Sequence, residues 1–138
     1  MAIDIARLRD FENLDRLSPE TLRKTARCAV EIEVHDGDAL FGEGDPPDAV
    51  YLLDKGAFLL TRASRSEPVS LRRAPAWLGE MAAVDGGHHM LTAVAHEDSK
   101  LIEIPLEDFT SLLHEDPALA RILLDQAIRV MRSSLEQG

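Results

Sequence analysis

Cysteine and long apolar runs are both scarce in this chain of 138 residues. Cys28 is the only cysteine, which excludes an intramolecular disulfide and a cysteine-based metal cage. No apolar run approaches the roughly 20 residues of a membrane-spanning helix. The N-terminus carries Asp4 and lacks the long apolar core of a signal peptide. We therefore expect a single domain over residues 1–138 that works in the cytoplasm and has no membrane partner.

Positive charge is also in short supply. The chain has 15 Lys and Arg residues against 25 Asp and Glu residues, which gives a formal net charge of −10. An acidic surface repels the phosphate backbone of nucleic acids, and no helix-turn-helix pattern follows the last predicted helix. We therefore expect no DNA partner, although a few local basic groups could still hold one small anion.

The motifs of catalysis and of metal binding are missing as well. The sequence contains no nucleophile elbow, no HExxH pair and no phosphate-binding Walker loop, so we predict that it is not an enzyme. His88 and His89 lie near Asp85 and His96. Adjacent histidines point in opposite directions on an extended chain, and this argues against a shared metal ion. We predict no metal and no cofactor.

The order of apolar residues predicts helices at both ends and short strands between them. A rough apolar stripe predicts a helix over residues 4–16, and Ser18-Pro19 is a typical helix start, so we assign residues 1–28 to N-terminal helices. From Val30 the pattern alternates, and about eight short segments separated by turn residues follow. They predict a β-roll over residues 29–104.

Residues 105–138 are predicted to form two C-terminal helices. Asp116-Pro117 starts the second one, with Asp as the cap and Pro just inside. Its apolar residues recur in steps of four, four, three and four, as in a coiled coil. They are Ala120, Leu124, Ile128 (or Ala127), Met131 and Leu135. The stripe predicts either a helix packed on its own strands or a seam with a protein partner or second copy through residues 117–136, and the two can coexist.

Residues 77–95, reading WLGEMAAVDGGHHMLTAVA, combine a turn, a short helix and a strand. Such a segment can form a pocket for a small anion, because unpaired N–H groups at a helix start attract negative charge. Gly79 allows a ligand to approach the backbone closely. Glu80 is an acceptor suited to hydroxyl donors, such as those of a sugar.

Over residues 18–136 the chain resembles the cyclic nucleotide-binding domain of bacterial catabolite-activator-type regulators and of kinase regulatory subunits. The resemblance rests on LFGEGDPPDAVYLLDKGAF at 40–58, LGEMAAV at 78–84 and TAVAHEDSKLIEIPLEDF at 92–109. It implies a mainly β fold with flanking helices, namely a double-stranded β-helix or jelly-roll-like β-roll. It also implies a regulatory module with cyclic AMP or cyclic GMP as its ligand.

In that family the central stretch is the phosphate-binding cassette, whose Glu binds the ribose 2′-hydroxyl and whose Arg pairs with the cyclic phosphate. Carried over by position, Glu80 matches the Glu, His89 occupies the Arg place and Thr92 occupies the hydroxyl place. The resemblance thus implies ten ligand-binding residues: Leu78, Gly79, Glu80, Met81, Ala82, His88, His89, Leu91, Thr92 and Ala93.

The histidine at the arginine position decides how far this resemblance extends to the ligand. An Arg fork makes two charge-assisted bonds to a phosphate, whereas a histidine makes at most one and is mostly neutral near pH 7. Loss of one such bond costs about 1.5–3 kcal/mol. We expect weak or absent cyclic nucleotide binding unless His88, His89 and Arg72 or Arg73 together supply the charge. Two functions follow: a stand-alone sensor module, or an interaction module that assembles through its last helix without a ligand.

Overall fold

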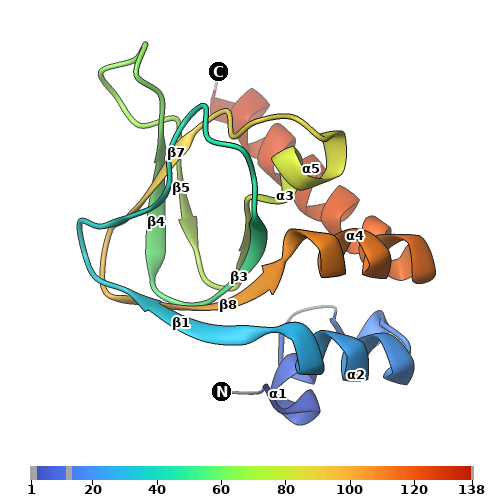
Figure 1. Cartoon of the computed structure of the whole chain (residues 1–138). Coiled ribbons are helices and arrows are strands. Elements are labelled where there is room, and N and C mark those ends of the chain that lie inside the picture. Colours follow the sequence, from blue (N-terminus) through green and yellow to red (C-terminus); the bar gives the residue numbers. More distant parts are fainter. Residues whose placement is uncertain (1–2, 12–13, 138) are drawn as a thin grey trace.

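The computed structural model describes residues 3–11 and 14–137. Its elements follow the order helix, β-roll, helix (Figure 1). They are α1 (Ile5–Arg9), the 3₁₀ turn η1 (Leu14–Arg16), α2 (Pro19–Cys28), β1 (Val30–Val34), β2 (Ala39–Phe41), β3 (Ala49–Lys55), β4 (Ala57–Thr61), β5 (Ser70–Arg73), β6 (Ala76–Leu78), α3 (Glu80–Asp85), β7 (Thr92–Ala95), β8 (Ser99–Pro105), α4 (Leu106–Glu115) and α5 (Pro117–Gln137).

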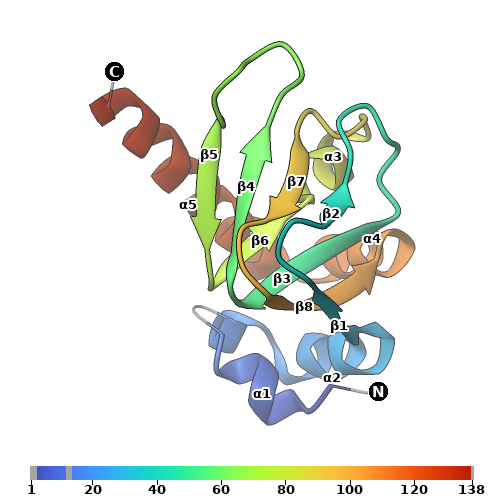
Figure 2. The ribbon, with the colours of Figure 1, turned by 90° about the vertical axis from the view of Figure 1, so that its left-hand side faces the viewer.

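The strands form two antiparallel sheets of four strands each, in the orders β1-β8-β3-β6 and β2-β7-β4-β5. Figure 2 shows the second sheet in front, with β6, β8 and β3 behind it. Consecutive strands β3 and β4 belong to different sheets, so the chain passes between layers at Gly56. Gly56 has φ +105°, and a Cβ there would lie 2.1 Å from Ser99 Oγ. The predicted β-roll is confirmed.

Strand β3 explains where the core lies. Five consecutive residues, Ala49–Leu53, are buried, because this strand is covered on both faces. Tyr51 and Leu53 point between the sheets, where they meet Phe58 and Leu60 of β4. Val50 and Leu52 point the other way and pack under the helices. The apolar residues of a single strand thus contribute to both hydrophobic clusters.

The hydrophobic cluster under the helices joins them to the outer face of the β1-β8-β3-β6 sheet. Fully buried side chains from the N-terminal part (Leu8, Leu22) and from α4 (Phe109) pack with Ile102 and Ile104 of β8. Figure 1 shows these helices gathered on one side of the sheets. No described helix is both long and apolar enough to cross a membrane.

The prediction of one helix over residues 4–16 is wrong. α1 ends at Arg9, and Asp10 caps it with its backbone N–H bonded to the carbonyls of Arg7 and Leu8. The part of the prediction that falls on residues 12 and 13 lies outside the described residues. A separate 3₁₀ turn buries Leu14. The apolar residues of this stretch are buried as the pattern indicates, but they lie on two short elements that pack into the same cluster.

Asp116 fixes the last helix to the first part of the chain. Its Oδ2 accepts hydrogen bonds from Ser18 N (3.0 Å) and Thr21 Oγ1 (2.8 Å). Its Oδ1 accepts from Ala118 N (3.1 Å) at the start of α5. The predicted helix start at Asp116-Pro117 is therefore confirmed, and the same carboxylate also bonds to the start of α2.

We expect Asp116→Ala to lower the free energy of unfolding by about 1–3 kcal/mol, because it removes a helix cap together with its bonds to α2. Urea denaturation at neutral pH measures this. Asp116→Asn keeps an acceptor without the charge and should lose less. These hydrogen bonds also hold the pKa of Asp116 below its ordinary value of 3.8. Its contribution is therefore present above that value and is lost as pH falls through the lower, folded-state pKa. Equal stability of wild type and the alanine variant would contradict this role.

Candidate functional site

A pocket of about 240 Å³ opens between the cassette and the inner face of the β2-β7-β4-β5 sheet. This volume lies just below the roughly 300–1,000 Å³ of common ligand sites, which favours a small ligand. The walls of the pocket are mostly apolar. Its charged lining residues are arginines from the β4–β5 segment (residues 62–73) and two acidic residues. The lining residues are Phe41, Leu60, Arg62, Arg65, Val69, Arg72, Leu78, Gly79, Glu80, Met81, Ala82, Asp85, His88, His89, Met90 and Leu91.

Gly79 makes the turn that brings the cassette back over the sheets. It has φ +79°, a left-handed conformation that residues with a Cβ rarely adopt. A Cβ at this position would lie 3.4 Å from His89 Cε1 and 3.5 Å from the Ala49 carbonyl oxygen. α3 begins at the next residue, and no side chain caps its first N–H groups. These are ordinary van der Waals distances, so the left-handed turn and not a lack of space is what requires glycine here.

Glu80 is buried at the wall of this pocket and is paired with Arg72. Arg72 Nη1 donates to Glu80 Oε1 at 3.0 Å and to the Trp77 carbonyl at 2.8 Å. The two side chains are only 12% and 9% exposed. Among the described residues, Arg72 Nε and Glu80 Oε2 have no hydrogen-bond partner although both atoms are buried. Unsatisfied buried polar atoms are rare and costly, so this donor and this acceptor lack partners that the described residues do not supply.

Gln126 connects this pair to α5. Its Oε1 accepts from Trp77 N at 2.8 Å, and its Nε2 lies 3.3 Å from Glu80 Oε1 and 3.5 Å from the Trp77 carbonyl. Gln126 is 8% exposed, on the same helix face as the buried Leu119, Ile122 and Leu123. A single hydrogen bond, from Gln126 to Glu80, therefore links the pocket carboxylate to the last helix.

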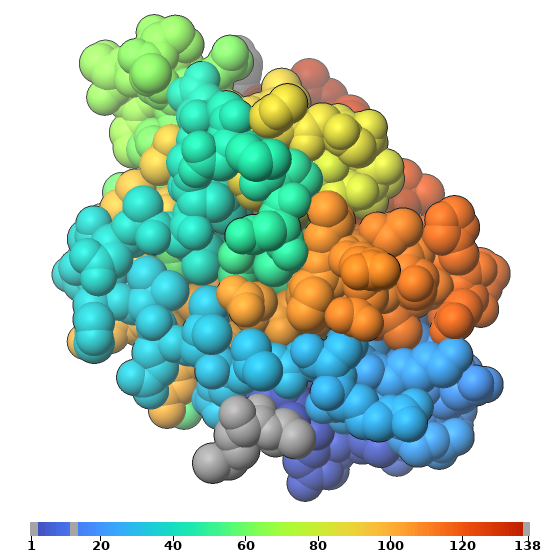
Figure 3. All heavy atoms as spheres, in the orientation of Figure 1, coloured from blue at the N-terminus to red at the C-terminus, as the bar shows by residue number. Residues whose placement is uncertain are grey.

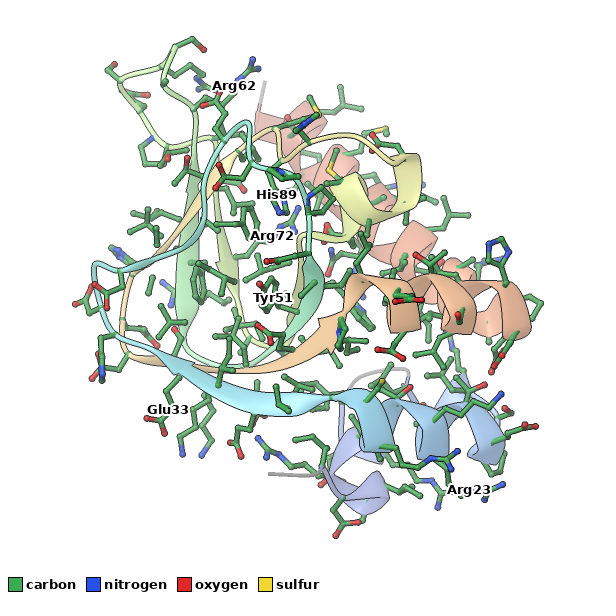
Figure 4. All side chains as sticks on the ribbon, viewed as in Figure 1. Arg23, Glu33, Tyr51, Arg62, Arg72 and His89 are labelled. Carbon is green, nitrogen blue, oxygen red and sulfur yellow. The ribbon has the colours of Figure 1, made fainter. Side chains whose placement is uncertain are left out.

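His89 forms part of the pocket wall and is fixed there by stacking. Its ring lies 3.8 Å from that of Phe41, centroid to centroid, with 12° between the planes. Burial lowers the pKa of His89 below its ordinary value of 6.5, and this outweighs the opposite effect of Asp45 and Asp48. The imidazole is therefore neutral near pH 7. Figure 4 shows His89 above Arg72 in the space between the sheets.

The structure brings most of the predicted site residues together. Eight of the ten line the pocket: Leu78, Gly79, Glu80, Met81, Ala82, His88, His89 and Leu91. Thr92 and Ala93 do not. The Thr92 hydroxyl accepts a bond from Glu43 N at 2.9 Å, and Ala93 is fully buried between the sheets. Of the two arginines considered from the sequence, Arg72 lines the pocket and Arg73 does not.

Sequence reasoning missed several lining residues and the link to α5. Phe41, Arg62 and Arg65 come from segments distant from the cassette, so no local motif marks them. Gln126 did leave a signal, because it is a polar residue spaced three and four positions after the apolar Leu123 and Ile122. A polar side chain within a buried stripe needs a partner, and that need points to a buried network.

We expect the stability of the protein to fall as pH drops from about 7.5 to about 5.5, in part because of His89. The unfolded chain takes up a proton near the ordinary histidine pKa, whereas the folded chain holds His89 neutral to lower pH. The stabilising contribution is therefore present above 6.5 and is lost below it. Urea denaturation at both pH values should show a smaller loss for His89→Gln than for wild type. Equal losses would contradict a neutral, buried His89.

Comparisons with known proteins agree with this geometry. The model of the cyclic nucleotide-binding domain family matches residues 31–116. The chain is 34% identical over 106 residues to the global nitrogen regulator of Synechococcus elongatus, covering 72% of this chain and 48% of that one. It is 30% identical over 106 residues to the cAMP-dependent protein kinase regulatory subunit of Aspergillus niger, covering 77% of this chain and 26% of that one.

A solved structure gives the same result. The catabolite activator protein of Thermus thermophilus superposes with a TM-score of 0.70 at 26% identity, covering 87% of this chain and 58% of that one. The chain spans about half the length of the cyanobacterial relative and about a quarter of the fungal one. The family match includes most of the β-roll, the cassette and α4. This chain therefore belongs to the cyclic nucleotide-binding domain family.

Proposed function

We propose that this chain is a regulatory sensor module in which a small molecule in the cassette pocket changes how α5 is held. The observation that carries the proposal is the shared hydrogen bonding at Glu80. Its Oε1 accepts from Arg72 in the sheet and from Gln126 on α5, while its Oε2 has no partner among the described residues. Ligand contact and helix contact thus meet on one carboxylate.

A ligand that binds at Glu80 has a physical route to the helix. A donor at Oε2 moves or reorients the carboxylate and so changes its bond to Gln126. Hydrogen bonds to charged groups contribute about 1.5–3 kcal/mol, which is comparable to typical coupling free energies of about 1–3 kcal/mol between two sites. Both curated relatives described above carry the names of regulators, a nitrogen regulator and a kinase regulatory subunit. The names support regulation by this module, not catalysis.

Cyclic AMP and cyclic GMP bind this pocket weakly under the proposal. The family's phosphate partner is an arginine in the cassette, and here the position holds a neutral histidine stacked on Phe41. The charged bond that most strongly fixes a cyclic phosphate is therefore missing, while the acceptor for a hydroxyl, Glu80, remains in place.

We expect His89→Arg to bind cyclic AMP or cyclic GMP about tenfold to a hundredfold more tightly than wild type, because it restores a charge-assisted bond to the phosphate. Titration calorimetry measures both affinities. His89→Gln is the matched control, since it changes the same residue without adding charge. Hydrogen exchange should then show altered protection of α5 when the nucleotide binds to the arginine variant.

The link through Gln126 separates binding from signalling in this test. In the His89→Arg background, Gln126→Leu should reduce the change in α5 exchange when both proteins are compared at nucleotide concentrations that saturate them. If neither wild type nor His89→Arg binds a nucleotide, the pocket is not a variant of the family site and this route to the sensor function is refuted. Binding without any effect on α5 would refute the regulatory step.

A second candidate function rests on the exposed half of α5. Leu124, Ile128, Met131 and Leu135 are 53%, 43%, 62% and 75% exposed and recur in steps of four, three and four. Figure 2 shows this half of the helix extending past the edge strand β5. The first half, with Leu119 and Ile122, is buried. We propose that the exposed seam pairs with the same seam of a second copy, so that the module is also an assembly unit.

We expect Met131→Glu and Leu135→Glu each to weaken self-association at least tenfold, because a charge buried in a helical seam is costly. Light scattering coupled to size-exclusion chromatography over a concentration series measures the change. Ser133→Glu adds the same charge on the opposite side of the helix and should have little effect. A wild-type protein that stays monomeric at high concentration would refute the seam.

A further inference from the structure

The β4–β5 segment concentrates positive charge in an otherwise acidic chain. Residues 62–73 hold four of the chain's 15 Lys and Arg residues and one acidic residue, Glu67. Arg62 and Arg65 come from this segment and line the cassette pocket. Neither side chain makes an ion pair within the described residues, 3–11 and 14–137. Two arginines that line the pocket therefore have no ion-pair partner among the described residues.

Both arginines lie at the open rim of the pocket. They are exposed, and they belong to the loop that follows β4. Figure 3 shows this loop protruding from the upper left of the molecule, and Figure 4 shows Arg62 above His89 and Arg72. Arg72 is different, because it lies deeper and is neutralised by its ion pair with Glu80. The cations that remain for a ligand anion are thus at the rim and not in the cassette.

At the inner end of the pocket, the unpartnered polar atoms favour a different chemical group of the ligand. Glu80 Oε2 is an acceptor and Arg72 Nε is a donor, both buried and both without a partner among the described residues. A hydroxyl group matches this pair chemically, since its hydrogen can donate to a carboxylate and its oxygen can accept from a guanidinium. The pocket wall also includes the apolar residues Leu60, Leu78 and Leu91.

We propose that the ligand of this pocket is a small organic anion with an apolar body, a hydroxyl group at one end and a carboxylate or phosphate at the other. The hydroxyl binds Glu80 and Arg72, the body lies against the leucines, and the anionic group binds Arg62 and Arg65. This assignment rests on the proposed function, because it names the ligand class of the same site. It reverses the family pattern, in which the cassette residue supplies the cation.

The other charged group at the pocket fits this orientation. Asp85 lines the pocket on the cassette side, and its Oδ1 already accepts a bond from Gly87 N at 2.8 Å. Its negative charge disfavours an anion beside the cassette and favours one beside the arginines of the β4–β5 segment. The neutral His89 adds no opposing attraction. The electrostatics of the pocket walls thus separate an anion end from a hydroxyl end.

Four probes with one aromatic body test the assignment. Para-hydroxyphenylacetate and para-hydroxybenzylphosphonate carry both groups and distinguish a carboxylate from a phosphate-like anion. Phenylacetate lacks the hydroxyl group, and para-hydroxyphenylethanol lacks the charge. Titration calorimetry on the wild-type chain measures binding, with fluorescence of Trp77, the only tryptophan, as a second readout. We expect at least one hydroxy anion to bind at least tenfold more tightly than both incomplete probes, because each lost charge-assisted bond costs about that much.

Matched variants locate the anion. Arg62→Gln and Arg65→Gln should each weaken the best hydroxy anion about threefold to fivefold, because both arginines are exposed, and they should leave the affinity for para-hydroxyphenylethanol unchanged. Arg73→Gln is the control, because it removes the same charge from an exposed arginine of the same segment that does not line the pocket. All three residues are exposed, so the fold should persist, which a thermal melt verifies.

The proposal is overturned if neither hydroxy anion binds better than the incomplete probes. It is also overturned if Arg73→Gln weakens binding as much as the two rim variants, which would show only a general effect of charge. The proposed sensor function fails separately. If the hydroxy anion binds through Arg62 and Arg65 but leaves the hydrogen exchange of α5 unchanged, the proposed ligand site is supported and the proposed regulation of α5 is refuted. If His89→Arg responds to cyclic nucleotides but no hydroxy anion binds, only the ligand class falls.

Discussion

The burial of one carboxylate, Glu80, determines how three parts of this molecule meet. Taking a carboxylate out of water costs several kcal/mol unless partners compensate it. Arg72 from β5 and Gln126 from α5 both donate to it, and both side chains also bond to the backbone of Trp77 in β6. Removing any one of them leaves the others with unsatisfied polar atoms. The two sheets and the last helix are thus held together by a polar contact inside an otherwise apolar core.

This arrangement places a hydrogen-bond partner of Glu80 and an exposed apolar stripe on one helix. Gln126 is buried on α5, whereas Leu124 and Ile128, two residues to either side, are exposed. An α-helix is stiff over such a distance, so a shift of Gln126 moves the exposed stripe as well. The fold therefore needs no chain of intermediate contacts between pocket and seam. Only two residues of helix separate Gln126, which contacts Glu80, from the exposed Leu124 and Ile128.

The strands were predictable from the sequence because their signal is local. Alternation over β1, the apolar run of β3 and the turn residues between strands all reflect which face each residue buries. The Asp116-Pro117 helix start is local for the same reason. The helix over residues 4–16 failed because apolar spacing does not report a break at Asp10, where the chain turns to pack elsewhere.

The site was only partly predictable, because its chemistry depends on contacts between distant residues. The cassette positions follow from the motif, yet the state of His89 depends on Phe41, which lies in another strand. Thr92 has the expected residue type, but Glu43 N occupies its hydroxyl. The arginines at the rim belong to a loop whose sequence says nothing of where it folds. Residue identity is local information, whereas burial and pairing are decided by the tertiary structure.

Where the cation sits changes how such a pocket responds to its ligand. A cassette arginine would be partly buried, where charges attract strongly and are weakly screened. Arg62 and Arg65 are exposed, so water and salt reduce their contribution to affinity while leaving their attraction for an approaching anion. For the proposed ligand we therefore expect fast exchange and occupancy of the site at higher concentrations. Under the proposed function, a ligand shifts α5 only by its differential affinity for two helix positions, and that difference is assigned to contacts at the buried Glu80. Capture at the rim and signalling at the inner end are thus assigned to different residues.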